Sequence, residues 1–301
     1  MIVVQLTGGL GNQLFQYAFA RHLAHLNQCE LMIDSSQVAS RSDLAHRRKF
    51  KLDHFRINAP VVDWNPPAER SFDHGGIKYS RSRIPWFRNL LGHKHYLNEL
   101  KESHFHYDSS ALQQRGDFYV TSYWQSHRYF DAISDLIRSD LHLREPLSEL
   151  HRAIRDQILS TPNSVAFIVR RGDFANHPHH SKFHGCCPPE YYEQALDLIK
   201  SRVAKPHLFV FSDDIPWVRQ NFLFDLPVTF MDHAYDHSDY DYVDLYFISC
   251  CLNHIIANST FGWWGAWLSS FEDGIVLAPK RWFLDESINT SDLSPSQWYR
   301  I

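Results

Sequence analysis

The chain has 301 residues, with 30 Lys and Arg against 34 Asp and Glu and a formal net charge of -4. This balance excludes the positive electrostatic footprint of a dedicated nucleic-acid-binding protein, and the 44% hydrophobic and 15% aromatic content excludes an intrinsically disordered chain. A chain of this length folds as two domains of about 150 residues or as one large α/β unit.

The first half opens with a strand, a glycine loop and a helix. The predicted elements are, in order, a strand at 2–6, a helix at about 12–26, strands at 30–33 and 118–121, and a helix at 131–142. Residues 34–110 are expected to be irregular, because prolines and a Gly-Gly pair interrupt every longer pattern.

The second half alternates strands and helices more regularly. Strands are predicted at 164–169, 207–211, 228–231, 254–257 and 275–278, and helices at 189–203, 242–251 and 261–269, with another helix before residue 228. This alternation predicts parallel sheets. We place an N-terminal domain at residues 1–150 and a C-terminal domain at 151–301, near a charged segment flanked by Pro146 and Pro162.

The cysteines indicate the compartment. There are five, an odd number, and four form adjacent pairs that suit no ordinary disulfide framework, which favours a reducing cytosol. Polar residues interrupt the N-terminal apolar stretch, so we expect no secretory signal. The longest later apolar region, 243–257, contains an aspartate and a histidine and predicts no membrane span.

The first candidate motif is the glycine loop between the opening strand and helix. Gly9 and Gly11 would let the backbone approach a ligand, and the helix N-terminus at Asn12 offers N–H groups to an anion. A dinucleotide-binding fingerprint would need a glycine at Leu14, so NAD binding is disfavoured. A tight turn without a ligand is the alternative.

The second motif comes directly after the strand at 164–169. Arg170 and Arg171 at a strand end would bind an anion, with Asp173 close behind them. Successive strand residues point to opposite faces, so only one arginine is expected to reach a given ligand. A structural Arg–Asp pair at the surface is the alternative.

Two further strand ends carry polar residues. Asn258, Ser259 and Thr260 precede a helix and would cradle phosphate, or merely cap that helix. Asp213 and Asp214 would accept hydrogen bonds from a guanine edge or a sugar, or cap the next helix. Together the strand-end sites predict a nucleotide held in a cleft between two α/β halves.

Two other segments allow competing interpretations. The histidine-rich residues 177–187 contain zinc-ligand types, but not in a clean zinc spacing, and we predict no metal site. Residues 78–94 carry five Lys or Arg, no acidic residue and several apolar side chains. They form either a solvated face or a peripheral contact with an anionic membrane that carries a lipid-linked acceptor.

These motifs resemble those of a known family. The glycine loop and the helix start, residues 8–18, are similar to the opening of the bacterial α-1,2-fucosyltransferases. Further similar motifs, in the same order along the chain, are residues 123–130, 170–173, 211–214 and 258–264.

The resemblance implies an α/β fold with GT-B architecture, two facing Rossmann-like domains with GDP-fucose held mainly by the second. It implies inverting transfer of fucose from GDP-fucose to the 2-hydroxyl of a β-galactoside acceptor, with no metal or other cofactor. Arg170 would contact the diphosphate and Asn12 would lie near the reacting centre. The general base would be Asp173, with His184 as the second candidate, because the attacking hydroxyl must lose its proton.

By the same resemblance, Ser259 and Thr260 would bind phosphate oxygens, and Asp213 or Asp214 would read guanine. One position departs from the family pattern: Ile168 stands where a histidine usually precedes the arginines. Two alternatives therefore stay open, another GDP-sugar transferase and a catalytically silent glycan-binding protein. The enzyme is expected in the cytoplasm, peripherally at the inner face of the membrane if residues 78–94 bind lipid.

Overall fold

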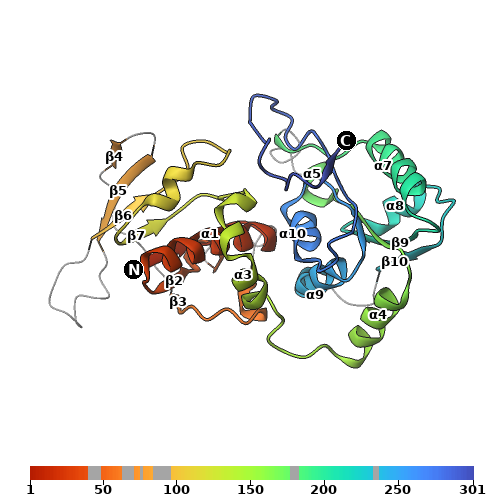
Figure 1. Ribbon diagram of the computed structural model, residues 1–301, viewed down its shortest axis with the longest axis horizontal. Coiled ribbons are helices and arrows are strands. Elements are labelled where there is room, and N and C mark those ends of the chain that lie inside the picture. Colours follow the sequence, from red (N-terminus) through yellow and green to blue (C-terminus); the bar gives the residue numbers. More distant parts are fainter. Residues whose placement is uncertain (40–48, 63–70, 75–76, 84–95, 177–182, 233–236) are drawn as a thin grey trace. The chain divides into compact units, whose positions relative to one another are not determined.

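The computed structural model describes residues 1–301 except 40–48, 63–70, 75–76, 84–95, 177–182 and 233–236. The chain divides into two compact units (Figure 1). Unit 1 comprises Met1–Glu145 and Ser291–Leu293, and unit 2 comprises Pro146–Thr290 and Ser294–Ile301.

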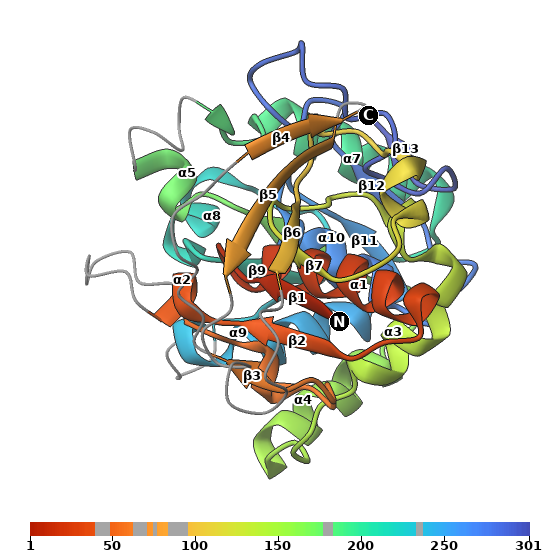
Figure 2. The ribbon, with the colours of Figure 1, turned by 90° about the vertical axis from the view of Figure 1, so that its left-hand side faces the viewer.

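Unit 1 is built on a seven-stranded sheet in the order β3-β2-β1-β7-β6-β5-β4 (Figure 2). Its strands are β1 (Ile2–Gln5), β2 (Leu31–Asp34), β3 (Val61–Val62), β4 (Ser71–His74), β5 (Ile77–Arg83), β6 (Tyr96–Leu100) and β7 (Phe118–Val120). Its helices are α1 (Leu10–Asn27), α2 (Ser36–Ala39) and α3 (Ser134–Asp140), with short 3-10 turns η2 (Leu52–His54), η4 (Ser109–Gln113), η5 (His127–Tyr129) and η6 (Asp131–Ile133).

The core of unit 1 lies around β1 and α1. The apolar run of Ile2, Val3 and Val4 is wholly buried, as expected for a central strand paired in parallel with β2 and β7. Helix α1 is buried along most of its length and ends at Asn27; the C-cap residue Gln28 has a left-handed backbone (φ 50°), which lets its N–H reach the carbonyls of the last turn.

The prediction of an irregular segment at 34–110 is wrong for the described part of it. Strand β6 pairs in parallel with β7, and β4 and β5 extend the sheet as antiparallel strands. Their pairing partners, rather than a local apolar period, define these strands. The predicted helix at 131–142 is also divided, into η6 and α3.

Unit 2 has a six-stranded, wholly parallel sheet in the order β10-β9-β8-β11-β12-β13. The strands are β8 (Ser164–Val169), β9 (His207–Ser212), β10 (Val228–Phe230), β11 (Asn253–Ile255), β12 (Val276–Ala278) and β13 (Tyr299–Arg300). The helices are α4 (Glu149–Ser160), α5 (Gly172–Asn176), α7 (Pro189–Arg202), α8 (Ile215–Asn221), α9 (His237–Ser249) and α10 (Thr260–Leu268). The predicted α/β fold class is confirmed.

Helices cover both faces of the sheet in unit 2. Val165 and Phe167 of β8 belong to a core cluster that includes Tyr192 of α7. Ile168, which points to the other face, lies against Gly262 of α10, where an added Cβ would be 3.3 Å from the Ile168 Cδ1 atom. The side chain at the position that departs from the family pattern is therefore a core residue under α10.

In the described part of the chain, no helix is both long and apolar enough to cross a bilayer. Of the predicted membrane-contact segment 78–94, residues 84–94 lie outside the described residues, and 78–83 are described only as the backbone of β5. Most of the histidine-rich loop, residues 177–182, also lies outside them.

Candidate functional site

The glycine loop of unit 1 joins β1 to α1. Gly8 has a left-handed backbone (φ 79°), and a Cβ at this position would lie 2.5 Å from Asn12 Nδ2. A side chain here would be strained and would displace Asn12. Gly9 is the extended N-cap of α1 and Gly11 is buried in its first turn, so the predicted residues surround the N-terminus of this helix.

Amide side chains fix this loop to its neighbours. Gln125 Nε2 donates to Asn12 Oδ1 at 3.1 Å. Gln13 donates to the Gly8 carbonyl, and Gln16 accepts from Thr7 N and donates to Ser122 O. These glutamines were not predicted as site residues; for Gln13 and Gln16 the signal in the sequence was that both are amides in the otherwise largely apolar first half of α1.

The arginine motif lies at the carboxyl end of β8, beside that of β9. Because β8 and β9 pair in parallel, with Val169 opposite Ser212, the arginines and the aspartates come together. Arg170 Nη1 is 2.8 Å from Asp213 Oδ2, and the Arg171 backbone N–H donates to Asp213 Oδ1 at 2.8 Å. Asp213 therefore orients both the backbone and the guanidinium of the motif.

The two arginines have different surroundings. The Arg171 guanidinium lies 3.7 Å from the centre of the Trp217 ring, and its Nε is 3.6 Å from Asp214 Oδ2. Asp214 also caps α8 by accepting from Trp217 N at 3.1 Å. Arg171 is thus held by Trp217 and Asp214 at the start of α8, whereas Arg170 pairs with Asp213, and about a quarter of each side chain is exposed to solvent.

Asn258 connects three loops. Its Nδ2 donates to the carbonyls of His184, Gly185 and Trp282, each at 3.1 Å, and its Oδ1 accepts from Cys187 Sγ at 3.4 Å. Burial raises the pKa of the Cys187 thiol to about 12, so the thiol stays protonated and can donate at neutral pH. In this geometry Asn258 orders the loops of the site through contacts with the protein itself.

Ser259 and Thr260 start helix α10 at the end of the β11 segment. Ser259 is the N-cap, and its Oγ accepts from Phe261 N at 3.3 Å. Because β11 pairs with β8, the N-terminus of α10 and Arg170 belong to the same edge of one sheet. A helix N-terminus with a neighbouring arginine is suited to an anion.

His184 belongs to an aromatic cluster. Its ring is stacked on Phe174 (centroids 4.5 Å apart, planes at 4°) and lies near Phe183 and Phe283. Arg170 Cζ is 5.5 Å from the Phe174 ring centre, so the same ring contacts both predicted residues. Asp173 is the second residue of α5, but its side chain lies outside the described residues, and its role stays a prediction.

Unit 2 thus brings together Arg170, the aspartates 213–214 and residues 258–260 at one sheet edge, while Asn12, Gly9 and Gly11 belong to unit 1. The sequence model of the family described as "Glycosyl transferase family 11" matches residues 78–301 of this chain. The chain belongs to glycosyl transferase family 11. The predicted relationship to the α-1,2-fucosyltransferases is confirmed at the level of this family.

Curated relatives cover nearly the whole length of this glycosyltransferase. It is 34% identical to the O-antigen biosynthesis glycosyltransferase WbnK of Escherichia coli, over 98% of this chain and 99% of the relative. It is 30% identical to an alpha-1,2-colitosyltransferase of Escherichia coli, over 100% and 99%. It is 24% identical to galactoside alpha-(1,2)-fucosyltransferase 2 of Hylobates lar, over 92% and 71%.

A solved structure agrees on the fold. The NodZ alpha-1,6-fucosyltransferase co-crystallized with GDP is similar with a TM-score of 0.50 and 15% sequence identity, over 88% of this chain and 91% of that one. The predicted GT-B architecture is therefore confirmed for this family 11 glycosyltransferase.

Proposed function

We propose that this family 11 glycosyltransferase moves L-fucose from GDP-β-L-fucose to the 2-hydroxyl of a terminal galactose, with inversion and without a metal ion. The observation that carries the proposal is Arg170, paired with Asp213 at the same sheet edge as the α10 N-terminus. Relatives named as α-1,2-fucosyl and α-1,2-colitosyl transferases support the sugar class and the linkage.

The chemistry requires stabilisation of the leaving group. As the bond from fucose to GDP breaks, negative charge develops on the diphosphate, and the sugar becomes oxocarbenium-like. Arg170 and the N–H groups at Ser259 and Thr260 would meet that charge with donors already in place. Asp213 would hold the Arg170 guanidinium in position, which removes the need to order it during the reaction.

The attacking hydroxyl must lose a proton as it bonds to the anomeric carbon. We assign this step to Asp173, with His184 as the second candidate and Asn12 near the reacting centre. The stacking of His184 on Phe174, a ring that also contacts Arg170, supports its proximity to the diphosphate end of the donor. The natural acceptor is proposed to be a β-galactoside, and a lipid-linked one if residues 78–94 form a peripheral membrane contact rather than a solvated face.

The second candidate function is colitosyl transfer, favoured by the 30% identity to the colitosyltransferase. A competition assay separates the two: the enzyme receives GDP-fucose and the corresponding colitose donor at equal concentration with lactose, and kcat/KM is obtained for each. We expect preference for fucose. Preference for colitose would overturn the donor assignment, and no transfer from either donor would favour a silent glycan-binding protein.

A further inference from the structure

An open depression in unit 1 is lined by polar and aromatic side chains that have no role in the site described above. It has a volume of about 400 Å³, within the range for small-ligand sites, and is lined by His104, His106, Tyr107, Asp108, Ser109 and Arg128. We propose that this depression binds the terminal sugar of the acceptor, an inference that rests on the proposed function.

The lining suits a neutral polyol. Arg128 supplies hydrogen-bond donors and Asp108 supplies acceptors, while the Ser109 and Tyr107 hydroxyls supply both. The lining carries one arginine and one carboxylate, so it does not present the excess positive charge that a diphosphate requires. Sugar hydroxyls, each a donor and an acceptor, match this mixture.

The side chains of the depression are ordered by one another before any ligand binds. The His104 and His106 rings are stacked, with centroids 3.7 Å apart and planes at 5°. The Arg128 guanidinium carbon lies 4.3 Å from the Tyr107 ring centre. His104 Nδ1 also donates to the His106 carbonyl at 3.0 Å, which holds the orientation of this ring. Such ordering reduces the entropy lost on binding.

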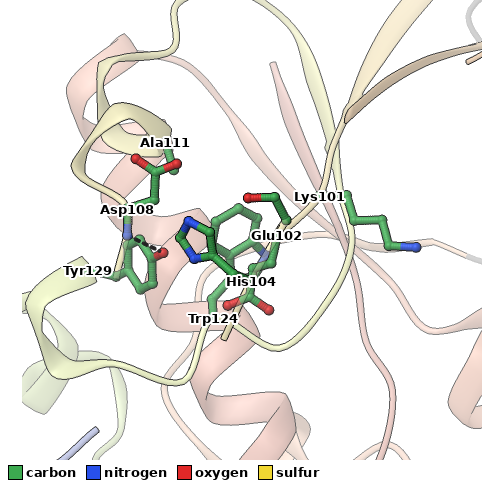
Figure 3. Close-up of a pocket in the computed structure, with 8 residues that line it drawn as sticks. Lys101, Glu102, His104, Asp108, Ala111, Trp124 and Tyr129 are labelled. Carbon is green, nitrogen blue, oxygen red and sulfur yellow. Dashed lines mark hydrogen bonds between the residues drawn. The ribbon is translucent and has the colours of Figure 1, made fainter. Parts of the chain in front are cut away.

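A rigid floor lies next to the depression. Figure 3 shows the small adjoining cavity, where the His104 ring lies in front of the Trp124 indole and Asp108 is joined to the Tyr129 hydroxyl. The cavity has room for about one water molecule, with a volume of about 10 Å³. Trp124 is stacked on Phe19 at 3.8 Å, so the floor is continuous with the core around α1.

The position of the depression connects it to the predicted reacting centre. His104 follows β6, and the segment from Trp124 to Arg128 follows β7, so both lie beyond the carboxyl ends of parallel strands. Gln125, next to Trp124, donates to Asn12 in the glycine loop. The backbone at Trp124 is left-handed (φ 57°), a strained conformation for this residue type that is common at functional sites.

The test uses two variants of the full chain. Ser109→Trp fills the depression from an exposed position, and His106→Ala removes one ring of the stacked pair. His142→Ala, an exposed histidine of unit 1 outside the lining, is the matched control. With GDP-fucose and lactose, both variants should raise the lactose KM about tenfold or more, with the GDP-fucose KM and the rate of GDP-fucose hydrolysis unchanged.

An unchanged lactose KM would overturn the proposal, and so would an equal rise of the GDP-fucose KM, which would place the sugar donor there instead. If the wild type transfers no fucose, the proposed function fails, but the subsite is still tested by saturation-transfer NMR with lactose alone. Loss of the lactose signal in Ser109→Trp but not in His142→Ala would support the subsite. Equal signals, or no lactose binding to the wild type, would overturn it.

Discussion

Replacing Glu102 by glutamine should change how the stability of this enzyme depends on pH. Glu102 follows β6; its Oε2 accepts from Tyr123 N at 2.9 Å, whereas its Oε1 is shielded from solvent and has no hydrogen-bond partner among the described residues. Burial raises the pKa of this carboxyl from 4.5 to about 7, against the opposing effect of the Trp124 and Tyr123 N–H groups. The protein therefore favours the neutral acid.

The size of the expected change in the free energy of unfolding follows from that pKa. Because the pKa is raised in the folded state, the neutral carboxyl makes its full contribution to the free energy of unfolding below the pKa of the unfolded chain. This contribution is lost as pH rises through the pKa of the folded protein. Between pH 4.5 and about pH 7, the wild type should lose up to about 3 kcal/mol relative to Glu102→Gln, at about 1.4 kcal/mol per pH unit. The amide keeps an oxygen that can accept from Tyr123 N, so the variant should not share this loss.

The assay is thermal unfolding of both proteins at intervals from pH 5 to pH 9, with unit 1 followed separately where two transitions are seen. Above pH 7 the unfolding temperature of Glu102→Gln should be higher than that of the wild type by roughly 6–12 °C, and this difference should shrink toward pH 5. Glu30→Gln, which changes an exposed carboxyl of unit 1, is the control. Parallel wild-type and Glu102→Gln curves across this range would refute the reasoning.

Four other changes test the site. Arg170→Ala should lower kcat by about 10²–10³ in the transfer assay without unfolding the protein, whereas Arg152→Ala, which changes an exposed arginine of α4, should leave kcat unchanged. Asp213→Asn keeps an acceptor for the Arg171 backbone N–H but loses the ion pair with Arg170, and it should lower kcat about tenfold. Asn258→Ala leaves three carbonyls without their donor and should lower the unfolding free energy by about 2–4 kcal/mol, measured by urea denaturation; a loss below about 1 kcal/mol would contradict its role in ordering the loops. Gly8→Ala should cost about 1–3 kcal/mol in the same measurement, and wild-type stability would show that the loop accommodates a Cβ.

The sequence predicted those strands that can be recognised from their own apolar residues. β8 is a continuous apolar run and β1 is another, so both were recognisable without knowing their partners. β6 was missed because, among its side chains that the structure describes, Leu97 and Leu100 are deeply buried but Asn98 and Glu99 are not. Its identity depends on pairing with β7, which no local pattern reports.

The candidate site was likewise predictable from the sequence in part. Arg170 and Asp213 could be expected at one sheet edge, because consecutive parallel strands place their carboxyl ends together. The stacking of Arg171 on Trp217 and the three carbonyls held by Asn258 could not, since both depend on loop conformations that follow from tertiary packing. The depression around His104 and Arg128 joins segments after two strands, one of them absent from the predicted elements.

The central claim is tested most directly by the product itself. The purified enzyme is incubated with GDP-fucose, lactose and excess EDTA, and the linkage is read by NMR. The account predicts fucose attached through an inverted, α-configured bond to O2 of the galactose, formed at the same rate with and without EDTA. A product linked at another hydroxyl, a retained β-configuration, or activity abolished by EDTA would contradict it.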